Sequence, residues 1–102
     1  DKNLKKNIQQ ILNPLDIINK IKGVTFDWKD NNTSSSGVIA QEIEQVIPEA
    51  VVENESNKFK SVNYNCIIPY LIESIKILHK RIIKLENENK QLKSKEKKLI
   101  TT

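Results

Sequence analysis

Apolar residues in the last third of the chain recur alternately every four and every three positions. The residues of this pattern are Leu71, Ile75, Leu78, Ile82, Leu85, Asn89, Leu92, Glu96 and Leu99. The spacing is the heptad repeat of a coiled coil, with mostly Ile and Asn at position a and Leu at position d. The second half is polar outside this seam, and a lone helix of that composition is unstable in water. The sequence therefore predicts a long helix whose seam is covered by further copies of the chain.

The first half of this helix is more apolar than a coiled-coil seam requires. We expect it to begin near Asn65, because Pro69 is tolerated only in the first turn or so. Five further apolar residues lie off the seam, and we expect them to pack on a globular body: Ile67, Ile68, Ile72, Ile77 and Ile83. Taken alone, Ile at a, Leu at d and an Asn at a are all favoured in parallel dimers.

The preceding residues read as short helices and strands. Asn13-Pro14 is a good helix start, and Gly23 ends that helix. The further expected segments are an alternating strand at 24–29, an exposed loop at 30–36, a short buried strand at 37–39, a helix at 40–46, and a β-hairpin from 50–53 and 59–62. The predicted fold class is α+β, with a small globular body at 1–70 followed by the coiled-coil helix at 71–102.

Composition excludes several kinds of site. The chain has 102 residues, of which 37% are apolar and 29% charged, an ordinary balance for one small domain. Its single cysteine, Cys66, cannot form an internal disulfide, and no Cys/His spacing suggests zinc. The chain has no apolar run long enough to span a bilayer, and no phosphate-binding glycine motif. We therefore expect no metal, no cofactor and no membrane contact.

Positive charge is concentrated on the long helix. The net charge is +4, and residues 76–98 hold nine Lys or Arg against three Glu. Such a stretch can bind nucleic acid, but it is more often a solvated helix face, and no aromatic residues interleave with these lysines. In zipper proteins that bind DNA the basic region precedes the heptads. A nucleic-acid partner is therefore not expected.

Two stretches resemble a known family. Residues 1–8 read Asp-Lys-Asn-Leu-Lys-Lys-Asn-Ile, and residues 37–51 read Gly-Val-Ile-Ala-Gln-Glu-Ile-Glu-Gln-Val-Ile-Pro-Glu-Ala-Val. Both resemble the self-cleaving intramolecular chaperone of endosialidase type (peptidase family S74), found at the C-terminus of phage tail spikes, tail fibres and neck appendages. Asn63-Tyr64-Asn65 is similar to the family's Asp-Tyr-Ser entry into the long helix. The resemblance implies a homotrimer, in conflict with the dimer that the heptads favour.

The resemblance assigns a chemical role to Lys5. Family members cut themselves between a Ser and an Asp, so the cleavage site lies at Asp1 and the nucleophilic Ser precedes it. Lys5 is then the general base, forming a Ser–Lys pair that acts once, in cis. A Ser hydroxyl is a poor nucleophile until a base removes its proton, and a lysine does this only where burial lowers its pKa. A chain that starts at Asp1 is expected to be the inactive product. On spacing alone, Lys5 is one more solvated lysine.

Other residues of the second stretch are weaker site candidates. Gln41, Glu42 and Glu44 are expected to support the cleavage site, to contact the upstream region of the parent chain, or only to form the polar face of a helix. Gly37 is expected to permit a close backbone approach, and Pro48-Glu49 to turn the chain into the next strand. His79 flanks the seam at position e and is expected at the surface.

The resemblance implies a templating function. Three chains of a fibre must register before their β-structure grows, and a trimerising domain holds their ends together. Cleavage after folding leaves the fibre kinetically trapped. The expected setting is a virion precursor in the bacterial cytoplasm, whose partner is the β-structured upstream region of its own parent. The alternatives are a trimerisation module that is never cut, and the cleavage domain of a myelin-regulatory-type transcription factor.

Overall fold

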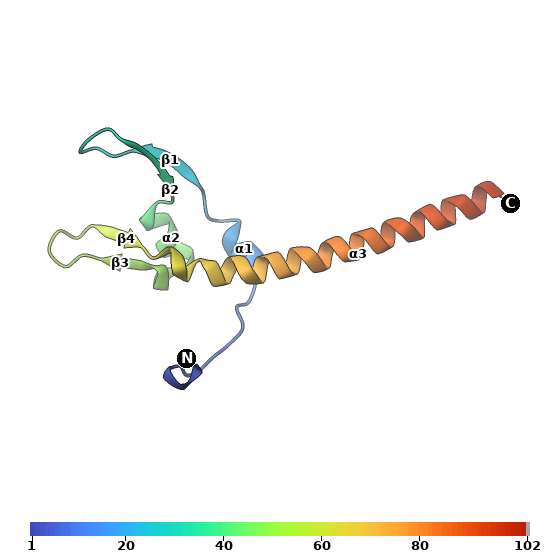
Figure 1. Cartoon of the computed structure of the whole chain (residues 1–102), viewed down its shortest axis with the longest axis horizontal. Helices are drawn as coiled ribbons and strands as arrows, with labels where there is room; N and C mark the ends of the chain where they lie inside the picture. The colour runs from blue at the N-terminus through green and yellow to red at the C-terminus, as the bar shows by residue number, and fades with distance from the viewer. Residues whose placement is uncertain (102) are drawn as a thin grey trace.

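One long helix gives the molecule its shape. The computed structural model describes residues 1–101, and the last residue of the predicted segment 71–102 lies outside them. The helix α3 (Ile68–Thr101) projects far beyond a small body of short elements, and the principal extents are 77 × 43 × 21 Å (Figure 1). This arrangement of short strands and helices followed by one long helix confirms the α+β prediction.

Nine short elements precede α3 in the described part of the chain. In chain order they are the 3₁₀ turn η1 (Lys2–Leu4), α1 (Pro14–Ile18), β1 (Val24–Asp27), β2 (Ser34–Gly37), α2 (Ala40–Val46), the 3₁₀ turn η2 (Pro48–Ala50), β3 (Val51–Glu53), β4 (Lys60–Val62) and the 3₁₀ turn η3 (Tyr64–Cys66). The strands form two separate antiparallel hairpins, β1–β2 and β3–β4. Asn13 precedes α1 as predicted, but its side chain makes no capping bond, and Pro14 is buried.

The β1–β2 hairpin corrects one prediction. The second strand is Ser34–Gly37, not 37–39, and it pairs from Val24↔Gly37 to Asp27↔Ser34. The serines pair through their backbone while their side chains stay exposed, so no apolar alternation marks the strand. Ser34 Oγ donates a hydrogen bond of 2.7 Å to Asp27 Oδ1 across the hairpin. A polar run therefore forms a strand because its partner strand supplies the hydrogen bonds.

The β3–β4 hairpin follows the prediction. Val51 pairs with Val62 and Glu53 with Lys60. The connecting loop is organised by Asn54, whose Oδ1 accepts hydrogen bonds from the backbone N–H groups of Ser56 (2.9 Å) and Asn57 (3.3 Å). Lys58 completes the loop with φ 63°, in the left-handed region that a residue with a Cβ rarely adopts.

A glycine at position 58 is expected to stabilise this loop. Lys58→Gly removes the Cβ that makes a left-handed backbone unfavourable, whereas Lys58→Ala removes the same side chain but keeps the Cβ. We expect Gly to be more stable than Ala by about 1 kcal/mol in the free energy of unfolding, measured by urea denaturation at fixed protein concentration. At the neighbouring exposed Glu55, whose φ is not positive, the order of Gly and Ala should reverse. Equal stabilities at position 58 would contradict this account.

The core is small and formed mainly by isoleucine. Its fully packed members are Ile43, Ile47, Ala50 and Ile67, and the half-buried residues around them are Ile17, Ile18, Ile21, Val38, Val46, Val51, Val62, Cys66 and Tyr70. These residues come from α1, α2, the second hairpin and the start of α3. A core of this size gives one small domain only modest stability.

The side of α3 that packs on the body is distinct from its heptad seam. Ile67, Tyr70, Ser74 and Ile77 form the packed stripe, while the six apolar seam residues from Leu71 to Leu92 are 42–64% exposed. From Leu78 to Ile100 every side chain of α3 is exposed. The seam is thus available to further copies of the chain.

The five off-seam isoleucines do not all behave as predicted. Ile67 belongs to the core and Ile77 is half-buried, but Ile68, Ile72 and Ile83 are exposed. The prediction was wrong for these three because the body covers only one side of the helix. Ile68 lies one heptad before Ile75, so it extends the seam by a position a, and Ile72 lies beside the seam at position e.

Candidate functional site

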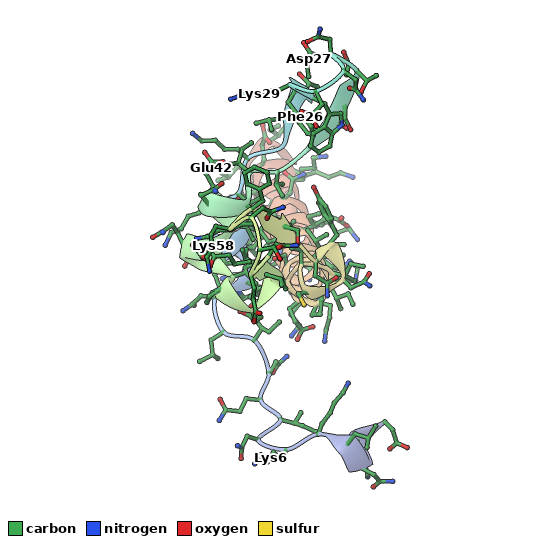
Figure 2. All side chains as sticks on the ribbon, turned by 90° about the vertical axis from the view of Figure 1, so that its left-hand side faces the viewer. Lys6, Phe26, Asp27, Lys29, Glu42 and Lys58 are labelled. Atoms are coloured by element: carbon green, nitrogen blue, oxygen red, sulfur yellow. The ribbon has the colours of Figure 1, made fainter. Side chains whose placement is uncertain are left out.

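The first twelve residues form an arm that extends away from the body. We call residues 1–12 the arm. Asp1 Oδ1 accepts a hydrogen bond from Asn3 N at 2.9 Å within the turn η1. The chain is extended at Lys5 and bends at Asn7, which has φ 54° in the left-handed region. Figure 1 shows the arm leaving near α1, and Figure 2 shows Lys6 far from Phe26 and Glu42. Three large apolar residues of the arm are exposed, namely Leu4 (86%), Ile8 (70%) and Leu12 (79%).

Lys5 is exposed on this arm, immediately after η1. The structure does not bring it near the second family-like stretch, because Lys6 already lies well apart from Glu42 in Figure 2. Its role as general base therefore stays a prediction. Within one copy of the chain, the arm supplies Asp1 and Lys5 and the body supplies no covering surface for them.

The base of the arm is held against α3. Gln10 Nε2 donates a hydrogen bond of 2.7 Å to Glu73 Oε1, and Lys76 Nζ lies 3.1 Å from Glu73 Oε2. These two hydrogen-bond donors, Gln10 first, lower the pKa of the Glu73 carboxyl. The arm therefore leaves α3 from a fixed point near Glu73, while its outer part has no such anchor.

Gly37 marks a close contact between the first hairpin and η3. A Cβ built on Gly37 lies 2.6 Å from Tyr64 Oη, closer than carbon and oxygen atoms approach. The same hydroxyl accepts a hydrogen bond from Val38 N at 3.2 Å. The predicted close approach at Gly37 is thus present, and the approaching group is a side chain, Tyr64, that sequence reasoning had treated only as part of a helix entry.

Pro48 and Glu49 follow α2 directly, and Glu49 contacts the long helix. Pro48 begins the turn η2, which leads directly into β3, as predicted. Glu49 Oε2 accepts a hydrogen bond of 2.7 Å from the hydroxyl of Tyr70 on α3. Burial, followed by this bond, raises the pKa of Tyr70 to about 12. A folded pKa above the unfolded one stabilises the fold below pH 10, and that stability is lost as the pH rises through 12.

A shallow groove lies between the two hairpins. Gln41 lines it, whereas Glu42 lies exposed on α2. The groove has a volume of about 570 Å³, and its apolar walls are Phe26, Trp28, Val38, Ile39, Val62 and Tyr64. The rings of Phe26 and Trp28 meet edge to face with centroids 4.9 Å apart.

Glu44 is a further member of the second stretch with a defined partner. Its Oε1 accepts a hydrogen bond of 2.6 Å from Lys60 Nζ, which ties α2 to β4. This bond is the main reason that the pKa of Lys60 is raised. Sequence reasoning gave Glu44 no partner, because the contact joins elements sixteen residues apart and nothing local in the sequence marks it.

The described residues contain no cluster suited to a metal ion. No group of three or more His, Cys, Asp or Glu side chains gathers anywhere in residues 1–101. Cys66 is half-buried and His79 exposed on α3. No helix in this part of the chain is long and apolar enough to cross a membrane.

Comparison with known proteins settles which family the chain comes from. A family model described as chaperone of endosialidase matches residues 1–52, which include the arm, Gly37 and Glu49. The chain belongs to the endosialidase chaperone family. The matched region spans the arm, α1, the first hairpin and α2.

Individual relatives are phage proteins. The chain is 35% identical over 103 aligned residues to the long tail fiber protein Gp37 of Salmonella phage S16, an alignment that covers 91% of the chain and 14% of the relative. It is 34% identical over 96 residues to the long tail fiber protein Gp37 of Enterobacteria phage K3, covering 86% of the chain and 8% of that protein. The chain thus spans about a seventh or less of the length of these relatives.

Proposed function

We propose that this domain is a homotrimeric intramolecular chaperone that templates the folding of a phage tail fibre region in its own parent chain and is then released by self-cleavage. The observation that carries the proposal is the exposed heptad seam on a helix of 34 residues. The body at 1–70 then faces the fibre, and the helix at 71–102 holds three copies together. Trimer is chosen over dimer because the parent fibre is expected to be trimeric and the bodies add contacts to those of the helices.

The physical purpose of the trimer is to shorten the search for register. Long-range β-pairing between three chains is slow because loop and association entropy must be lost first. A trimeric domain raises the effective concentration of the three upstream ends. The similarity to tail fibre proteins supports a parent that is part of the virion, and the parent would fold in the host cytoplasm before assembly.

The proposed release step uses Lys5. In a parent that carries a Ser before Asp1, Lys5 takes the proton of the Ser hydroxyl, and the hydroxyl oxygen attacks the carbonyl carbon of the same Ser. The peptide bond between Ser and Asp breaks as the cyclic ester of the Ser, a β-lactone, forms. The amine of Asp1 leaves with the proton first held by Lys5. Water then hydrolyses the ester to a carboxylate on the upstream fragment. The cut removes the template, so the fibre cannot refold once unfolded, but the activation barrier to its unfolding stays high.

Intact mass spectrometry of the parent protein tests the proposal. The wild-type parent should yield a fragment that starts at Asp1, and Lys5→Ala should reduce its rate of appearance by at least about a hundredfold, since the general base is lost. Lys6→Ala is the matched control, because Lys6 is the adjacent exposed lysine on the same arm, and it should cleave normally. Equal cleavage in both variants would remove Lys5 from the mechanism.

A trimerisation module that is never cut is the second candidate. The exposure of Lys5 in a single chain favours it, because nothing in one copy withdraws that side chain from water. An uncut wild-type parent that still forms trimers would select this candidate over the self-cleaving one.

A further inference from the structure

The charges on the outer part of α3 are sorted by heptad position. Between residues 76 and 98, six of the eight lysines lie at the outward positions b, c and f. The three glutamates instead occupy or border the seam, with Glu86 at e, Glu88 at g and Glu96 at a. Arg81, the single arginine of the chain, also lies at g. This separation indicates that the flanks of the seam have a charged partner.

Arg81 has no acidic partner in its own chain. The side chains one turn away from it along the helix carry no carboxylate and are those of Ile77, Leu78, Lys84 and Leu85. Arg81 is exposed, and within residues 1–101 it forms no ion pair. The same holds for Glu86, Glu88 and Lys93. Because a guanidinium group is well suited to a two-bond contact with a carboxylate, the flank of the seam is prepared for an acidic residue of another chain.

A parallel assembly in register supplies the missing partners. In a parallel coiled coil, the g residue of each heptad faces the e residue of the following heptad on the neighbouring helix. Arg81 then faces Glu86 of the next copy, and Glu88 faces Lys93 of the next copy. At the remaining g–e levels of α3 one of the two residues is uncharged, so no like charges meet. Both charged levels are therefore attractive when the copies are aligned.

A slip of one heptad would bring like charges together. Arg81 would then face Lys93 of the next copy. On the opposite flank of the helix, Glu86 would face Glu88, and Lys93 would face Lys95. Like charges held side by side are unfavourable, and here no attractive pair offsets them. The charges thus favour the aligned register over its nearest alternative.

We infer that the e and g charges of α3 select other copies of this chain and hold them in register. The inference rests on the proposed trimer and adds the alignment of its helices. Asn89 at position a acts in the same direction, because a slip would leave its amide opposite an apolar or a charged side chain. A slip of one heptad displaces a body along the axis by about 10 Å. Charges that exclude the slip keep the three bodies level, and with them the upstream chains whose strands must pair.

Charge reversal tests the inference on the whole domain. Arg81→Glu makes each contact with Glu86 repulsive, and we expect the dissociation constant from sedimentation in low salt to rise at least about tenfold. Lys80→Glu, the same reversal at the adjacent exposed position f, should leave the constant unchanged. In 1 M salt the Debye length is about 3 Å, so the wild type and Arg81→Glu should converge. An effect of Arg81→Glu no larger than that of Lys80→Glu would overturn the inference.

A reversal of Glu86 identifies the partner of Arg81. Glu86→Arg alone should weaken assembly as Arg81→Glu does, because two cations then meet. The variant with both reversals regains opposite charges and should return to within about threefold of the wild-type constant. When the two singly reversed chains are mixed, native mass spectrometry should find assemblies of both chains in excess of the statistical proportion. No recovery in the double variant, or purely statistical mixing, would contradict the pairing.

Sedimentation of the wild type separates this inference from the proposed function. A monomeric wild type would mean that the proposed trimer is wrong, and the inference would fall with it. An assembled wild type that is insensitive to both reversals would leave the trimer in place and remove only the inference.

Discussion

Ile82→Lys should convert the assembled domain into single chains. Ile82 occupies position a of the seam and is 53% exposed in one chain, so the substitution leaves the body intact. In a trimer the same position is buried, and the three ammonium groups would lie together at the axis without partners. Removing a charge from water without a partner costs about 3 kcal/mol or more, and each 1.4 kcal/mol is tenfold in the dissociation constant. We expect assembly to weaken at least a hundredfold.

Ile83→Lys is the matched control for this prediction. Ile83 is the adjacent isoleucine and is 44% exposed, but it lies at position b, outside the seam. It should leave the sedimentation coefficient unchanged at the same protein concentration. If both variants remain trimeric, the heptad seam is not the interface. If both dissociate, the apolar face that assembles is wider than positions a and d.

Gly37→Ala should destabilise the body by about 1–3 kcal/mol. Gly37 does not have a positive φ, so its backbone conformation suits alanine, and the cost comes only from the Cβ that would lie 2.6 Å from Tyr64 Oη. Either Tyr64 moves, and loses its hydrogen bond with Val38 N, or the first hairpin shifts away from η3. The free energy of unfolding from urea denaturation, at fixed concentration, measures the loss.

A second substitution tests the cause. Tyr64→Phe removes the hydroxyl that the new Cβ meets, so Gly37→Ala should cost at least about 1 kcal/mol less in the Tyr64→Phe background. Gly23→Ala serves as the control, because a Cβ there meets nothing within 4 Å and its φ is not positive. That substitution should be neutral or stabilising by about 0.5 kcal/mol. A full cost for Gly37→Ala in both backgrounds would mean that Tyr64 is not the obstacle.

Local patterns predicted the elements that carry their own signal. The heptad gave α3, the alternation through Phe26 gave β1, and the helix at 40–46 matched α2. The strand β2 was not predicted at Ser34–Gly37, because this segment has no alternation of apolar residues and forms a strand only by pairing with β1. The sequence also did not predict that Ile68, Ile72 and Ile83 are exposed. An apolar residue in a sequence indicates that its side chain will be covered, but not whether its own chain or another chain covers it.

A feature of the candidate site could be predicted from the sequence only where a residue type by itself indicates a particular kind of contact. A glycine in a family-like stretch indicated a close approach, and the structure confirmed it at Gly37. The partners Tyr64, Tyr70 and Lys60 could not be inferred, because each joins elements far apart in sequence through one hydrogen bond. The path of the arm was equally hidden, since extended backbone without period or caps has no sequence signature.

The long uncovered part of α3 sets the direction in which the helices of the proposed trimer would come together. Near the body, Ile68, Ile75 and Ile82 occupy position a, whereas Asn89 and Glu96 occupy it further out. The outer turns gain little stabilisation from contact with other copies until the turns nearer the body are already aligned. We therefore expect contact between the helices to begin next to the body and to proceed outward along α3. Opening should run in reverse, from the free tip inward. The end of α3 that lies next to the body is then the first to assemble and the last to separate.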